Sequence, residues 1–207
     1  MDSFQSKQHV LFSLRHAKYL PTPYEAEDAN RMTLGYFCLS SLALLPCPSS
    51  SSSSSSTPSE EENVNSIETM LRPVQRQGFI DWVYQQQLPD IGGFRGSNSM
   101  ESTLKTSSSS TASTSRITLD PPNIIQSYTA ILILALLDDS LEKLNRSALL
   151  RLVGKCQNSD GSFSLFPGCQ EPGDPRSTYS AFAICSMLND WDSIDIDLGL
   201  KFLNSCR

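Results

Sequence analysis

Cysteine and histidine are common ligands of transition-metal ions, and this chain of 207 residues has six cysteines and two histidines. The two histidines, His9 and His16, both lie near the start, and no two cysteines form the C-x-x-C pair of a zinc or redox site. Residues 1–10 are polar and lack the order of a secretory signal, which favours reduced thiols in a cytoplasmic protein. We therefore expect mostly core cysteines, at Cys38, Cys47, Cys156, Cys169, Cys185 and Cys206.

The charge pattern limits the possible partners. The chain has 16 basic and 22 acidic residues, and no basic run stands out, so we expect no nucleic-acid partner. The longest apolar run covers residues 131–137, whereas a membrane-spanning helix needs about 20 residues. This run predicts a buried segment and no transmembrane helix.

An internal repeat places the remaining candidate residues. Residues 128–139 (YTAILILALLDD) return as residues 179–190 (YSAFAICSMLND), and residues 33–42 are an earlier relative. Each segment is apolar on nearly every side and predicts a helix surrounded by other elements.

A second, amphipathic helix follows each apolar one. Leu149, Leu152, Val153 and Cys156 recur at helical spacing before Gln157, and a matching stripe ends at Cys206. The looser first copy runs through residues 79–86 and is followed by Gln87. Glycine turns, Gly92-Gly93-Phe94 and Asp160-Gly161-Ser162-Phe163, then close the first two copies.

Alternating inner and outer helices predict an all-α fold, a curved double layer that could close into an α/α toroid. Residues 1–207 are expected to form the N-terminal part of one such domain, because Arg207 stands where the repeat carries Gln157. Residues 48–66 and 97–119 are serine-rich and read as disordered low-complexity insertions. Phosphorylated regulatory loops are the alternative there.

These motifs resemble the β subunits of protein prenyltransferases, from about His9 to Arg207 apart from the insertions. The resemblance implies an incomplete α/α toroid of helical hairpins, of the kind shared with terpenoid cyclases. It also implies an enzyme that joins an isoprenoid to a protein cysteine. The matching segments are residues 30–37 (NRMTLGYF), 93–97 (GFRGS), 157–163 (QNSDGSF), 176–179 (RSTY) and 188–191 (LNDW).

The resemblance favours the β subunit of geranylgeranyltransferase type I. The farnesyl-transferring subunit has a tryptophan at the position of Thr33, where threonine leaves room for one more isoprene unit. Type I enzymes share this threonine and a phenylalanine at the position of Phe37. Rab-type enzymes also have a small residue there and stay open, as does the farnesyl type.

The resemblance also assigns pocket residues. Arg176 matches an arginine that lies beside the lipid and the CaaX peptide in the family. The alternative interpretation is that Arg176 only forms a surface ion pair with Asp174. Tyr128 and Tyr179 match tyrosines of the lipid pocket, or else pack in the core. Asn123 replaces a family histidine near the peptide carboxylate, which leaves the effect on CaaX selection open.

The family reaction uses zinc to convert the substrate cysteine to a thiolate. Its ligands are an aspartate, a cysteine two residues later and a distant histidine. The chain has no D-x-C and no histidine after His16, so no metal ligand or catalytic residue is assigned, and we expect the chain alone to be inactive. The implied partners are an α subunit, geranylgeranyl diphosphate and CaaX-terminated proteins such as small GTPases.

Two alternatives come from other classes. A non-catalytic helical-repeat subunit would bind an α subunit but no lipid. A terpenoid cyclase would need an acidic site, for which Asp138-Asp139 and Asp190-Trp191-Asp192 are too sparse.

Overall fold

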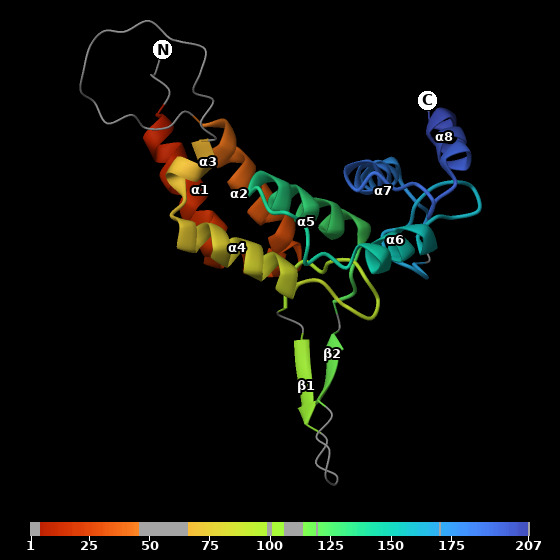
Figure 1. Cartoon of the computed structure of the whole chain (residues 1–207), viewed down its shortest axis with the longest axis horizontal. Coiled ribbons are helices and arrows are strands. Elements are labelled where there is room, and N and C mark those ends of the chain that lie inside the picture. The colour runs from red at the N-terminus through yellow and green to blue at the C-terminus, as the bar shows by residue number, and fades with distance from the viewer. Residues whose placement is uncertain are drawn as a thin grey trace, which may run out of the picture.

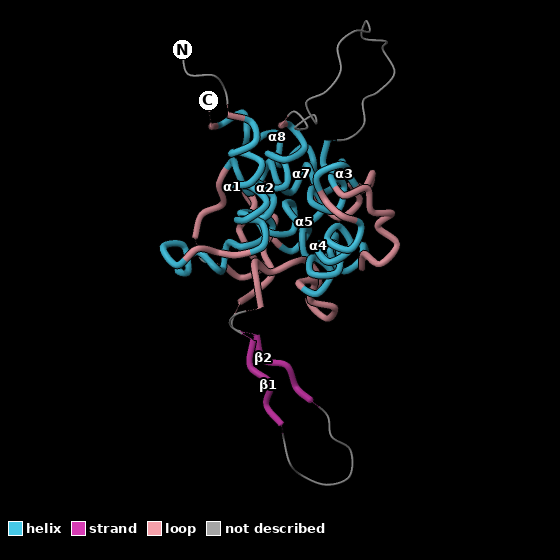
Figure 2. Tube along the Cα trace, turned by 90° about the vertical axis from the view of Figure 1, so that its left-hand side faces the viewer, coloured by secondary structure: helices cyan, strands magenta, loops and turns pink. Residues whose placement is uncertain are grey.

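The computed structural model describes residues 5–45, 66–98, 101–105, 114–118, 120–169 and 171–206. Figures 1 and 2 show helices gathered in one body and a strand pair that projects from it. The elements are α1 (Ser6–Lys18), the 3-10 helix η1 (Thr22–Asn30), α2 (Arg31–Leu44), α3 (Ser66–Met70), α4 (Pro73–Gln85), β1 (Glu101–Lys105), β2 (Thr114–Thr118), α5 (Ile124–Leu136), α6 (Arg146–Lys155), α7 (Pro175–Met187) and α8 (Ile196–Ser205).

The helices follow a curve from α1 to α8 (Figure 1). Helix α5 packs against α2 on one side and α7 on the other, and these three form the inner row. Helices α4, α6 and α8 follow them along the outer side, and α1 packs against α2. The predicted double layer of inner and outer helices is therefore present.

The two apolar segments form matching helices because their ends are specified in the same way. The side chain of Asn123 caps α5 by accepting from the backbone N–H of Gln126 at 2.8 Å, and Asp174 caps α7 by accepting from Ser177 at 2.7 Å. Asp138 and Asn189 then take positive φ values of 51° and 48° after the helices. Asp and Asn tolerate this left-handed conformation, so the acidic turn ends both helices.

The glycine turns fasten each hairpin to the next outer helix. A Cβ at Gly92 would lie 2.1 Å from the carbonyl oxygen of Ala148 in α6, and one at Gly161 would lie 2.1 Å from that of Leu198 in α8. Both glycines have positive φ, which other residues rarely adopt. The backbone can therefore touch the next helix only where glycine stands.

The glutamine before each turn has a defined role. The Gln157 side chain donates to the carbonyl oxygen of Asp195 and accepts from its N–H, both at 2.7 Å. Gln87 makes the same two bonds to Asn145, at 3.3 and 3.1 Å. Asn145 and Asp195 are the N-cap residues of α6 and α8, so each glutamine holds the start of the next outer helix.

The second serine-rich insertion, residues 97–119, was expected to be disordered, but its described parts are ordered. Glu101–Lys105 and Thr114–Thr118 pair as antiparallel strands, and Ser97 is buried, donating to Asp28 Oδ2 at 2.6 Å. Threonine and isoleucine suit paired strands, which outweighs the serine content there. In the first insertion only Ser66, the start of α3, is described, and the other residues of 48–66 lie outside the described part.

The cysteine prediction needs a correction. Cys156 and Cys185 are buried, Cys38 and Cys169 are half-buried, and Cys206 is exposed at the end of α8. Cys47 lies outside the described residues. The apolar stripe of α8 predicted a core position for Cys206, but no described element covers it.

Candidate functional site

The five predicted pocket residues lie together on the inner row of helices. They line one open pocket of about 500 Å³ between α2, α5 and α7. This volume is ordinary for a small-molecule site. The sequence had not singled out the other lining residues, which lie beside the predicted ones at helical spacing: Tyr36, Ile125, Thr129, Pro175 and Ser180.

A tyrosine pair connects α5 to α7 within the pocket. The rings of Tyr128 and Tyr179 meet edge to face with centroids 5.7 Å apart, and their hydroxyl oxygens are 3.4 Å apart. Burial, and then the hydrogen bond with Tyr179, raise the pKa of Tyr128 above its ordinary value. The Tyr128 hydroxyl thus stays protonated at neutral pH and can donate to a ligand.

Large apolar side chains in this pocket remain open to solvent. Phe37 is 57 % exposed and Tyr179 is 61 % exposed, although both belong to inner helices. The inner helices were expected to be surrounded by other elements, but these faces of α2 and α7 are open to solvent where they line the pocket. Apolar surface gathered in a hollow is typical of a binding site.

Thr33 is fixed by a chain of polar side chains that sequence reasoning missed. Its hydroxyl donates to Gln126 Oε1 at 3.1 Å, and Gln126 Nε2 donates to Asn30 Oδ1 at 3.2 Å. Asn30 in turn donates to Glu27 at 2.9 Å. Gln126 is buried in the first turn of a mostly apolar helix, and a buried glutamine needs hydrogen-bond partners, which is the signal that could have revealed this network.

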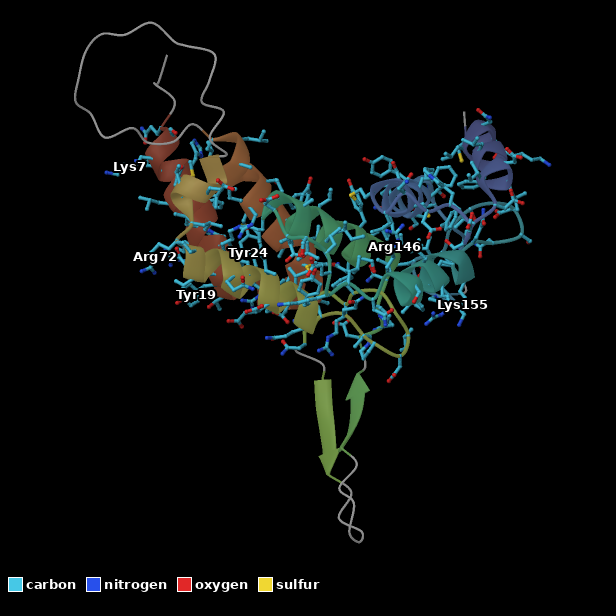
Figure 3. All side chains as sticks on the ribbon, in the orientation of Figure 1. Lys7, Tyr19, Tyr24, Arg72, Arg146 and Lys155 are labelled. Atoms are coloured by element: carbon cyan, nitrogen blue, oxygen red, sulfur yellow. The ribbon has the colours of Figure 1, made fainter. Side chains whose placement is uncertain are left out.

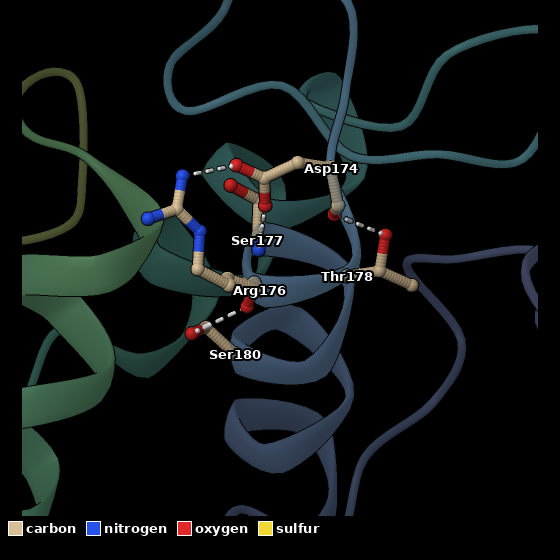
Figure 4. A network of polar contacts seen from close by, with 5 residues as sticks. All are labelled: Asp174, Arg176, Ser177, Thr178 and Ser180. Atoms are coloured by element: carbon tan, nitrogen blue, oxygen red, sulfur yellow. Dashed lines mark hydrogen bonds and ion pairs between the residues drawn. The ribbon is translucent and has the colours of Figure 1, made fainter. Parts of the chain in front are cut away.

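Arg176 lies at the edge of the pocket. It also forms the surface ion pair with Asp174 that was the alternative to a binding role. Its guanidinium donates to Asp174 Oδ2 at 2.9 Å, as Figure 4 shows, while its side chain stays 84 % exposed. Partial burial raises the pKa of Asp174, but the Ser177 N–H and Arg176 lower it more, so the net pKa lies below its ordinary value. The pair is ionised at neutral pH, and Arg176 can still offer donors to a ligand anion.

Asn123 has a structural role here. Its side-chain oxygen accepts from Gln126 N and its backbone joins the Phe94 turn, since Asn123 N donates to Phe94 O at 3.1 Å. The amide therefore anchors the start of α5 next to the pocket.

Within the described part of the chain, no three His, Cys, Asp or Glu side chains gather to hold a metal ion. The described helices also include none that is long and apolar enough to cross a bilayer. The zinc ligands implied by the resemblance do not fit any residues present here, because the sequence lacks D-x-C.

Comparison with known proteins defines the class. Residues 4–207 match the prenyltransferase alpha-alpha toroid domain, and the chain belongs to this family. The fold agrees with a solved structure of Candida albicans protein geranylgeranyltransferase-I complexed with GGPP, with a TM-score of 0.66 and 19 % identity over 98 % of this chain and 51 % of that one. The predicted α/α-toroid fold class is confirmed.

The curated relatives are β subunits of protein prenyltransferases. The geranylgeranyl transferase type-1 subunit beta of Dictyostelium discoideum is 28 % identical over 94 % of this chain and 53 % of its own length. The Arabidopsis thaliana subunit of the same name is 26 % identical over 99 % of this chain and 49 % of its own. A Pyricularia oryzae protein farnesyltransferase subunit beta is 26 % identical over 88 % of this chain and 27 % of its own. The chain thus spans about half the length of the type-1 relatives.

Proposed function

We propose that this chain forms the lipid-binding and peptide-binding half of the β subunit of a CaaX protein geranylgeranyltransferase type I. The observation that carries the proposal is the convergence of Thr33, Phe37, Tyr128, Arg176 and Tyr179 on one pocket between three inner helices. The similarity to type-1 subunits supports the choice of lipid, and the farnesyl type is the alternative because a farnesyltransferase subunit matches at similar identity.

Each residue has a distinct part in this proposal. Phe37, Tyr128 and Tyr179 provide apolar surface for the isoprenoid chain, whose burial drives its binding. Thr33, held by Gln126, keeps that position small, so a longer chain fits. Arg176 donates to an anionic group of the lipid or the peptide at the mouth of the pocket.

The remaining parts of the reaction come from outside this chain. The described residues contain no donor set for the zinc that would form the substrate thiolate. An α subunit, CaaX-terminated proteins and a cytoplasmic location complete the proposal, and the chain alone is expected to lack transferase activity.

Lipid selectivity tests the proposal directly. The chain, co-expressed with a prenyltransferase α subunit, is titrated with geranylgeranyl diphosphate and with farnesyl diphosphate by calorimetry. We expect the geranylgeranyl lipid to bind more tightly, and Thr33→Trp to weaken its binding by roughly tenfold or more while sparing the farnesyl lipid. Ser147→Trp, at an exposed position of α6 that does not line the pocket, is the control and should change neither affinity.

Two results would redirect the assignment. A preference for farnesyl diphosphate in the unchanged chain would favour the farnesyl type. Stable association with the α subunit, without binding of either lipid, would favour the non-catalytic helical-repeat subunit.

A further inference from the structure

A second cavity lies on the opposite face of α2 from the proposed site. It has a volume of about 310 Å³ and is formed by α1, α2 and α4, with Ile133 of α5 at its inner end. Helix α2 contributes Leu34, Gly35 and Leu39 to it, whereas Thr33, Tyr36 and Phe37 face the first pocket. At 100° per residue these two sets lie on opposite sides of the helix, so the two cavities are separate.

The walls of this second cavity are apolar. Leu39, Val83 and Ile133 are buried, and Phe79 and Trp82 are half-buried beside them. A cavity of this size is at the small end of the range of about 300–1,000 Å³ that holds small ligands. One unbranched chain suits it better than a ring system or a double-chain lipid.

The rim of the second cavity is basic. Lys18 and Arg31 supply its positive charge, and no carboxylate lines the cavity. Arg31 donates to Asp28 at 3.3 Å, but the ammonium of Lys18 makes no ion pair within the described part of the chain. Figure 3 marks Lys7 and Tyr19 near the two ends of α1, and residues 5–20, which include this helix, contain no acidic residue. Glu25 and Asp28 line the adjoining hollow beside Arg31, so the part of the rim that favours an anion is the end at Lys18.

We propose that this cavity binds a single-chain amphiphile with an anionic head group, either a carboxylate or a phosphate. The apolar chain lies between Leu39, Phe79 and Trp82, and the head group meets Lys18 at the rim. This site is independent of the proposed transferase site, and its test uses neither an α subunit nor a prenyl diphosphate.

Trp82 gives the site an internal optical probe. The other tryptophan, Trp191, packs edge to face on Phe182 with ring centroids 5.8 Å apart, away from this cavity. In a Trp191→Phe background, 11-bromoundecanoate is titrated below its micelle concentration, because bromine quenches indole fluorescence on contact. We expect saturable quenching of Trp82. Decanoate and decyl phosphate should each restore the fluorescence, and the one effective at lower concentration identifies the head group.

Gly78 offers a way to close the cavity without disturbing the fold. It lines the cavity on α4, and a Cβ built there meets nothing within 4 Å. Leucine and alanine are both better helix formers than glycine, so Gly78→Leu and Gly78→Ala should keep the helical circular dichroism. We expect Gly78→Leu to abolish saturable quenching and the smaller Gly78→Ala to retain it.

The Lys18→Gln variant tests the contribution of the anionic head group independently of the ligand's apolar chain. It should weaken bromoundecanoate binding by about fivefold, the size expected of an exposed ion pair, and leave 11-bromo-1-undecanol unaffected. Equal binding of the acid and the alcohol to the unchanged chain would overturn the anionic part of the proposal. Undiminished quenching in a folded Gly78→Leu variant would overturn the site itself.

Discussion

The α5–α6 hairpin and the α7–α8 hairpin share one sequence pattern but differ in burial. Helix α6 buries five residues, Ala148 to Leu150 with Leu152 and Val153, whereas α8 buries only Gly199. Helix α5 buries large residues such as Ile131 and Leu134 between its two neighbours, while α7 leaves Tyr179 largely exposed. Burial in this fold is therefore decided by adjacent hairpins as much as by a hairpin's own sequence.

The contacts between hairpins explain the difference. Helix α6 meets the Gly92 turn on one side, and on the other a Cβ at Gly154 would lie 2.3 Å from the carbonyl oxygen of Ser193. Helix α8 meets the Gly161 turn, and no later hairpin is described beyond it. Each outer helix thus needs a turn before it and a segment after it to be covered.

The largest expected consequence concerns two cysteines at the same repeat position, Cys156 and Cys206. Burial, and then the nearby Cys169, raise the pKa of the Cys156 thiol to about 12, whereas Cys206 is exposed. Because only the thiolate reacts, a disulfide reagent at pH 8 should modify Cys206 roughly a hundredfold or more faster than Cys156. Mass spectrometry of the labelled peptides measures both rates, and Cys206→Ser should remove the fast site. Similar rates would mean that α6 is no better covered than α8.

The repeat itself could be predicted from the sequence, because periodic apolar residues and glycine turns are local signals. The spacing of Tyr128 and Tyr179 correctly placed them at equivalent positions of two inner helices. The bond from Thr33 to Gln126 could not be predicted, because it joins residues 93 positions apart and depends on how α2 packs against α5. The exposure of Cys206 was missed for the same reason, since an apolar stripe does not say whether a neighbour covers it.

The second prediction tests the contact between turn and helix with two glycines of similar conformation. Gly161 and Gly168 have φ values of +90° and +79°, but a Cβ at Gly161 meets Leu198 O at 2.1 Å, while one at Gly168 meets nothing within 4 Å. Gly168→Ala should lower the free energy of unfolding by about 1–2 kcal/mol through backbone conformation alone. Gly161→Ala should cost about 1–3 kcal/mol more, because the next helix must move away.

Urea unfolding followed by circular dichroism measures both glycine variants. Equal costs would show that α8 moves freely away from the turn. That result would leave backbone conformation as the only reason for glycine at position 161.

The smallest effect compares the two glutamines that hold the next outer helix. The bonds of Gln157 are shorter than those of Gln87, so Gln157→Leu should lower the free energy of unfolding by about 1 kcal/mol, and Gln87→Leu by less. Gln77→Leu, which removes only a bond to Asp81 within α4, is the control and should cost about 0.3 kcal/mol. A larger cost for Gln87→Leu than for Gln157→Leu would contradict this expectation. It would mean that the side-chain amide stabilises the well-covered helix α6 more than the exposed helix α8. The glutamine would then add to existing packing rather than compensate for missing packing.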